Sequence, residues 1–198
     1  MFALLIVGAL VHFFVGSLTY VRNTIRGRSQ PNRITFLLWA AGPFIGFAAG
    51  ISAGGSWALL PVFMSGFGPF VIFLASFMNS KAYWKLGIFD YLCGLLAVCA
   101  LVLWALTKEP ATAVLFAILS DGFATLPTLL KAWKHPETET SIGYITAFLY
   151  VILGIVVIHS YSFTQLGFLV YLLISDFLMV VAVCRKNPWQ HLRADFAG

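Results

Sequence analysis

Seven long apolar stretches divide this chain of 198 residues, and they limit its possible folds more than any other feature. A helix needs about 20 mostly apolar residues to cross a bilayer, and it pairs its own backbone groups there. The predicted spans are Met1–Tyr20, Ile34–Ile51, Trp57–Met78, Ile88–Thr107, Ala111–Trp133, Ile142–His159 and Phe163–Cys184. Hydrophobic residues make up 61% of the chain, which is more than a soluble domain can bury. The sequence therefore predicts an all-helical integral membrane protein.

The basic residues predict the orientation of these helices. Eleven of the twelve Lys and Arg residues are assigned to the odd-numbered connections or to the tail after the seventh stretch, and Lys108 alone lies on the other side. The first connection is expected to hold Arg22, Arg26, Arg28 and Arg33. Since cytoplasmic loops are enriched in Lys and Arg, we expect the N-terminus outside and the C-terminus in the cytoplasm. The first stretch lacks a basic region before it and a cleavage site after it, so we expect a membrane helix there and not a signal peptide.

An internal repeat emerges when the chain from residue 9 is aligned with the chain from residue 118, at a constant offset of 109. The matched pairs include His12 with Asp121, Arg22 with Lys131 and Trp39 with Phe148. Both copies have a polar residue at mid-helix, a basic helix end, a polar turn with proline and an aromatic residue in the next helix. This order predicts two parallel three-helix bundles joined by a linker helix, a 3+1+3 plan. The expected units are residues 1–80, 81–109 (linker), 110–185 and 186–198 (cytoplasmic tail).

Two segments resemble known proteins. They are SQPNRITFLLWAAGP at Ser29–Pro43, and the stretch from FDYLCG at Phe89–Gly94 to PETE at Pro136–Glu139. They look like segments of a group of small bacterial membrane proteins, and the seven-helix plan resembles the SWEET sugar transporters and the wider PQ-loop superfamily. The resemblance implies a transporter in a bacterial inner membrane that works by alternating access. It implies a small, polar, sugar-like solute, or else an amino acid moved together with protons.

The chain departs from the superfamily pattern at three places. It has no Pro-Gln pair, because Pro127 is followed by threonine and Gln30-Pro31 has the reverse order. A glycine, Gly16, stands near the place of a hinge proline in the first helix. The only match for the mid-membrane asparagine of the third helix is Asn79, close to the cytoplasmic end. The fold therefore carries over more safely than sugar specificity.

His12, Asp121 and Asp176 lie well inside the apolar stretches, away from their ends, where a charge costs a few kcal/mol or more. Asp121 is expected to contact solute or carry a proton, with a structural hydrogen bond as the alternative. His12 is expected across a central cavity from Asp121, where the pair could share a proton near neutral pH; ordinary core packing is its alternative. Asp176 resembles in place a solute-contacting asparagine of the last SWEET helix; an internal salt bridge or helix contact is its alternative.

Two aromatic residues and two prolines complete the candidate site. Trp39 and Phe148 are expected to stack on a flat solute, with ordinary packing as the alternative. Pro127, six residues after Asp121, and Pro43 are expected to act as hinges, although membrane helices often contain proline. Asp90, near the basic third connection, is expected to be solvated or to pin a loop.

No enzyme motif, ATP-binding segment or retinal-binding lysine stands out, so we expect no cofactor and a facilitated or ion-coupled carrier. The three cysteines show no metal-ligand spacing, and the scattered basic residues do not indicate nucleic-acid binding. Expected partners are a small solute, protons and lipid, in a monomer or homodimer. A receptor or sorting protein of the same plan, or an intramembrane enzyme using His12 and Asp121, is the alternative from another class.

Overall fold

The computed structural model describes residues 2–52, 60–80, 84–106, 110–157, 163–185 and 188–196, and within them the chain is helical apart from short turns, with no strand. The predicted all-helical class is therefore confirmed. The helices are α1 (Phe2–Val11), η1 (His12–Ser17), α2 (Leu18–Ile25), α3 (Arg33–Ser52), α4 (Leu60–Ala75), α5 (Ile88–Leu106), α6 (Pro110–Lys134), η3 (Pro136–Thr138), α7 (Ser141–Val157), α8 (Phe163–Cys184) and α9 (Pro188–Phe196). The first three follow one another without a break, and η1 is a π-helical segment within that run.

Three of the described segments are long and apolar enough to cross a membrane: Ala3–Ile25, Val114–Lys134 and Leu166–Cys184. Shorter apolar helices cover Phe63–Ala75, Ile88–Leu103 and Ser141–Val157. Large apolar side chains stand on the outer surface of these helices, and Ile88, for example, is 80% exposed. A surface of this kind suits lipid and not water, because apolar area in water is unfavourable. The chain is therefore a membrane protein.

The first helix continues five residues beyond its expected end, to Ile25. It stops there because Gly27 has a φ of 75°, a left-handed conformation that ends helices. Arg22 therefore lies on α2, whereas the sequence placed it in the first connection, and Arg33 is the first residue of α3. The expected second and sixth connections and the basic residues Lys81 and Lys108 lie outside the described residues.

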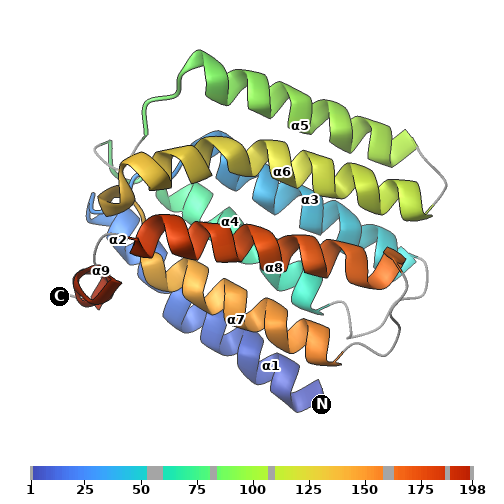
Figure 1. The fold of residues 1–198 in the computed structure, drawn as a ribbon, viewed down its shortest axis with the longest axis horizontal. Coiled ribbons are helices and arrows are strands. Elements are labelled where there is room, and N and C mark those ends of the chain that lie inside the picture. Colours follow the sequence, from blue (N-terminus) through green and yellow to red (C-terminus); the bar gives the residue numbers. More distant parts are fainter. Residues whose placement is uncertain are drawn as a thin grey trace.

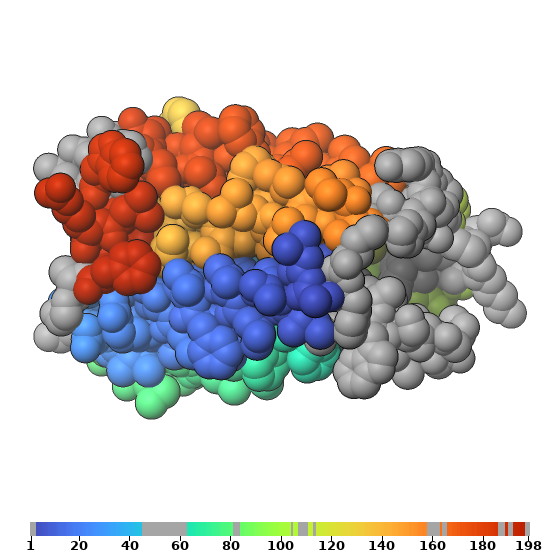
Figure 2. Space-filling view, turned by 90° about the horizontal axis from the view of Figure 1, so that it is seen from below, coloured from blue at the N-terminus to red at the C-terminus, as the bar shows by residue number. Residues whose placement is uncertain are grey.

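The helices lie side by side in two groups (Figure 1). In one group α4 packs against α3 and the α1–α2 run, and in the other α8 packs against α6 and α7. The groups meet at two seams, where α7 contacts α1 and η1, and where α3 contacts α6. Figure 2 shows the first seam, with α9 covering one end of it. Helix α5 lies at the outer edge against α6 and α3.

Polar side chains fix α3 in this arrangement. Asn32 caps the helix, because its Oδ1 accepts from the backbone N–H groups of Ile34 and Thr35 at 3.1 and 3.3 Å. Its Nδ2 donates to Asp90 Oδ1 at 2.5 Å, and Asp90 Oδ2 accepts from the N–H of Gly87 at 2.7 Å. Asp90 thus pins the connection before α5, one of the two roles considered for it.

Candidate functional site

A pocket of about 110 Å³ lies between the two helix groups. It has room for several ordered water molecules. Its lining is mostly apolar and aromatic, with a few polar groups, which is the usual character of a small-molecule site. The polar and aromatic lining residues include His12, Ser17, Tyr20, Trp39, Ser65, Asp121, Tyr144, Tyr150, Ser175 and Asp176. Both groups of helices contribute to it.

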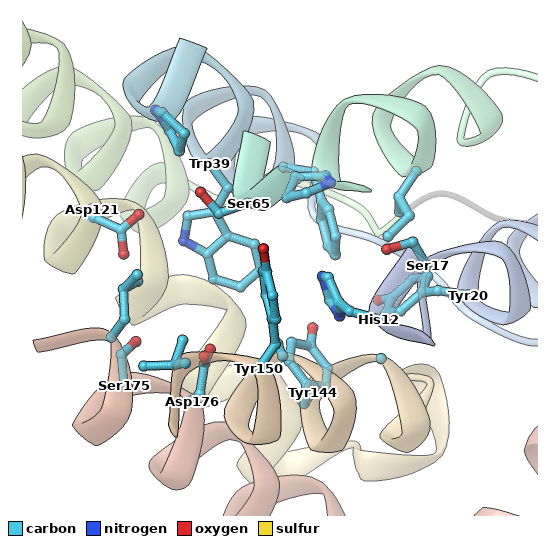
Figure 3. Close-up of a pocket in the computed structure, with 18 of the residues that line it drawn as sticks. His12, Ser17, Tyr20, Trp39, Ser65, Asp121, Tyr144, Tyr150, Ser175 and Asp176 are labelled. Carbon is cyan, nitrogen blue, oxygen red and sulfur yellow. The ribbon is translucent and has the colours of Figure 1, made fainter. Parts of the chain in front are cut away.

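The titratable residues occupy two ends of this pocket (Figure 3). Asp121 and Asp176 lie at one end, which we call the acidic end, and His12 lies toward the other. The rings of Trp39 and Tyr150 lie between them. The structure therefore brings His12, Asp121 and Asp176 to one pocket, but with aromatic rings between the histidine and the acids.

Asp121 is held by side chains on its own helix and on α8. Its Oδ2 accepts from Tyr171 OH at 2.7 Å and from the Thr125 hydroxyl at 3.3 Å. Thr125 Oγ1 in turn accepts from Trp39 Nε1 at 2.9 Å. This chain of hydrogen bonds fixes the Trp39 ring and the Asp121 carboxylate relative to each other. Both alternatives considered for Asp121, a helix contact and a place in the site, are therefore compatible.

His12 is 8% exposed and bonds to α7, because its Nδ1 lies 3.1 Å from Thr146 Oγ1. The Thr146 hydroxyl donates to helix carbonyls at 2.9 and 3.1 Å, so its oxygen accepts from the histidine. The His12 proton therefore lies on Nδ1, and Nε2 of the neutral ring is a hydrogen-bond acceptor. The ring also stacks on Tyr150, with centroids 5.9 Å apart and planes 11° apart.

The close approach of η1 to α7 depends on Gly16. A Cβ at this position would lie 2.0 Å from Thr146 Oγ1, so with any larger residue either the Thr146 side chain or the two helices would have to move. His12 opens the π-helical segment that contains this glycine. Such segments are rare and occur often at functional sites.

Asp176 lines the acidic end without a partner. Its carboxylate makes no hydrogen bond or ion pair with any residue that the structure describes. The same holds for Tyr150, which is 6% exposed and whose hydroxyl has no partner among the described residues. Most buried polar groups in proteins are hydrogen-bonded, so the unpaired Tyr150 hydroxyl beside the half-buried Asp176 makes this pocket a candidate binding site.

Trp39 and Pro43 line the pocket, whereas Phe148 and Pro127 do not. Phe148 instead packs against Phe177 on the side of α8, with ring centroids 6.0 Å apart. The prediction that Phe148 lines the cavity is therefore wrong, and Tyr150 lines it instead. Both prolines lie inside helices, and nothing in the geometry distinguishes a hinge from an ordinary helix proline.

The error at Phe148 comes from the constant offset of 109 that matched it with Trp39. The interval between α2 and α3 is residues 26–32, and the matching interval between α6 and α7 is residues 135–140, one residue shorter. The offset is therefore 109 before this interval and 108 after it. With an offset of 108 the lining residues of the two helices match in register: Phe36 with Tyr144, Trp39 with Ala147, and Pro43 with Val151.

A second set of buried polar side chains borders the pocket. Tyr20 and Tyr144 both donate to Glu139 Oε2, and the bond from Tyr144 is 2.7 Å long. Glu139 also forms an ion pair with Lys131, and their side chains are 0% and 1% exposed. Lys131 in turn donates to the Gln30 carbonyl. We call Tyr20, Lys131, Glu139 and Tyr144 the ion-pair cluster. Tyr20 and Tyr144 line the pocket, and through Lys131 the cluster joins the α2–α3 connection to the α6–α7 connection.

Sequence reasoning missed Tyr150, Tyr144 and Glu139. A signal for the tyrosines was present, because residues 143, 144, 147, 150 and 151 share one helical face. Glu139 gave no signal, because it stands in a polar turn where an acid is ordinary. Among the described residues, no group of three His, Cys, Asp or Glu side chains is arranged to hold a metal ion.

We compared the chain with protein families, curated proteins and solved structures, and none of them matches it.

Proposed function

We propose that this protein is a membrane transporter for a small polar solute. The observation that carries the proposal is the pocket itself, which lies between two groups of membrane-apolar helices and takes titratable residues from both. A lone acid in a membrane helix is costly and is retained mainly at sites of solute or ion passage. Here two acids and a histidine border a single pocket.

The proposed architecture is seven spans in the 3+1+3 plan of the SWEET and PQ-loop proteins. The packing of α4 with its group and of α8 with its group supports two equivalent units. The two seams support them as well, because each joins the first helix of one unit to the second helix of the other. The matched lining of α3 and α7 at an offset of 108 supports a parallel repeat. Helix α5 is then the linker, and the basic connections face the cytoplasm.

Alternating access requires that the pocket open to each side in turn. The ion-pair cluster closes it on the side of the two basic connections, so the cluster is the proposed cytoplasmic gate. Because it joins one connection of each unit, a rocking motion of the units would separate its members. Pro43 and Pro127 are the proposed hinges, because each removes a hydrogen bond within its helix.

Uptake into proteoliposomes tests this function. Labelled sugars, amino acids and amines are offered with and without an inward proton gradient, to wild type and to Asp121→Asn. Gradient-driven uptake that the variant loses makes Asp121 a proton carrier, and gradient-independent uptake that survives makes the protein a facilitator. If no compound is taken up but some bind, the protein is a receptor with the same pocket and the transport proposal is wrong.

A further inference from the structure

We infer that the pocket selects a small organic ammonium ion over a neutral or anionic molecule of the same size. This deepens the proposed function and uses the same pocket, but it is a statement about binding and can be tested without transport. It follows from the hydrogen-bonding groups, the charges, the aromatic rings and the size of the pocket.

The lining offers hydrogen-bond acceptors and has already used its N–H donors. Trp39 Nε1 donates to Thr125, and His12 Nδ1 donates to Thr146. The remaining nitrogen of His12 is an acceptor, as are the free Oδ1 of Asp121 and both oxygens of Asp176. A solute that bonds to these three residues must therefore supply donors, as an ammonium group does and a carboxylate does not.

The charge of the lining also favours an ammonium ion. Two carboxylates border the pocket, and no lysine or arginine stands among the lining residues that the structure describes. Lys131 is paired with Glu139, the acid to which the lining residues Tyr20 and Tyr144 donate. Buried carboxylates are costly unless a cation offsets them, so a cationic solute gains most at the acidic end.

The aromatic rings suit the same class of molecule. Trp39 and Tyr150 lie beside the acidic end, and Tyr144 also lines the pocket. The faces of such rings attract ammonium groups, most strongly where water is excluded. The Tyr150 hydroxyl is buried without a partner, so it can accept from the ammonium or donate to a hydroxyl of the solute.

The size of the pocket sets the size of the probe. A volume of about 110 Å³ suits a molecule of a few heavy atoms. Ethanolammonium, ethylene glycol and glycolate have nearly the same shape and differ in charge, so together they separate charge from size. Calorimetric titration of the purified protein in nanodiscs at neutral pH measures binding of all three.

We expect ethanolammonium to bind at least about 10-fold more tightly than either of the other two. Loss of one partner of a buried charge pair typically costs 2–5 kcal/mol, so Asp176→Asn should weaken ethanolammonium by about 30-fold or more. Glu137→Gln is the matched control, because Glu137 is an exposed acid outside the pocket, and it should leave binding unchanged. Tyr150→Phe should weaken ethanolammonium by a smaller factor.

Equal binding of ethanolammonium and ethylene glycol, tighter binding of glycolate, or no binding of ethanolammonium would each overturn the inference. The wild-type comparison stands even if a variant fails to fold. Uptake of the bound amine in proteoliposomes is then scored separately. Amine binding without uptake overturns transport and keeps this inference, whereas uptake of sugars alone keeps transport and overturns it.

Discussion

The protein holds carboxylates between its helices in two different settings. Glu139 in the ion-pair cluster has a cation and two phenol hydroxyls around it, so its charge is matched within the protein. Asp121 and Asp176 in the pocket have fewer partners: two hydroxyls bond to one oxygen of Asp121, and Asp176 makes no bond with the described residues. The two settings share a border at Tyr20 and Tyr144.

This difference separates groups that hold the structure from groups that meet a solute. A buried charge with all its partners is expensive to disturb, because removing one partner leaves the other uncompensated. A carboxylate without partners contributes little to stability and remains available to an incoming cation. Substitutions in the cluster should therefore lower stability, and substitutions in the pocket should change binding.

The largest effect is expected from Lys131→Met. This change leaves Glu139 buried without its cation, and breaking a buried pair typically costs about 3–5 kcal/mol. Unfolding in mixed micelles with increasing SDS measures the loss. The double variant Lys131→Met with Glu139→Gln should recover a large part of the lost stability. If Lys131→Met alone is as stable as wild type, the ion-pair cluster does not stabilise the fold.

The next largest effect is expected from Gly16→Ala. The added methyl group would lie 2.0 Å from Thr146 Oγ1, and overpacking of this kind costs about 1–3 kcal/mol. It should also weaken ligand binding, because it displaces the partner of His12. Gly42→Ala is the matched control, since its nearest neighbour would be Leu101 Cδ2 at 4.0 Å. Equal melting temperatures for the two variants would contradict the close packing of η1 against α7 at Gly16.

A smaller effect is expected from Asp195→Ala. Asp195 Oδ2 accepts from the Ser141 hydroxyl at 2.5 Å and from the N–H of Ile142 at 2.9 Å, so it caps α7 from α9. Loss of a cap costs about 1 kcal/mol. Asp195→Asn keeps an acceptor oxygen and should restore part of the stability, and failure of both variants to change it would show that α9 does not hold α7.

The smallest change in stability is expected from Asp176→Asn. Because Asp176 has no partner among the described residues, its charge supports no internal contact, and the free energy of unfolding should change by about 0.5 kcal/mol or less. The same SDS titration measures it beside Lys131→Met. A loss as large as that of Lys131→Met would mean that Asp176 is a structural residue and not a binding group.

The sequence predicted the helical class because apolar stretches of membrane length allow few alternatives. It also indicated the pocket residues His12, Asp121, Asp176 and Trp39, since polar or aromatic residues at matched depth in apolar helices are conspicuous. The stretches predicted as helices correspond to described helices with shifted ends. Seven membrane crossings and their orientation remain predictions.

The sequence could not predict features that depend on exact register or on contacts distant in the chain. An alignment at one constant offset cannot reveal that the α6–α7 connection is one residue shorter than the α2–α3 connection, and this placed Phe148 in the pocket in error. The partners of Glu139 come from α2, α6 and α7, so no local sequence pattern predicts the ion-pair cluster. The close contact of Gly16, in the π-helical segment, with Thr146 of α7 likewise joins residues that are distant in the chain.

Access to the pocket from each side tests the central claim most directly. Cys93, Cys99 and Cys184 are replaced by alanine, and a single cysteine is introduced as Ser175→Cys at the acidic end of the pocket. A membrane-impermeant thiol reagent is then applied to sealed vesicles of known orientation, from one side or the other. The account predicts labelling from both sides, slowed by a bound solute, whereas labelling from one side only would contradict alternating access.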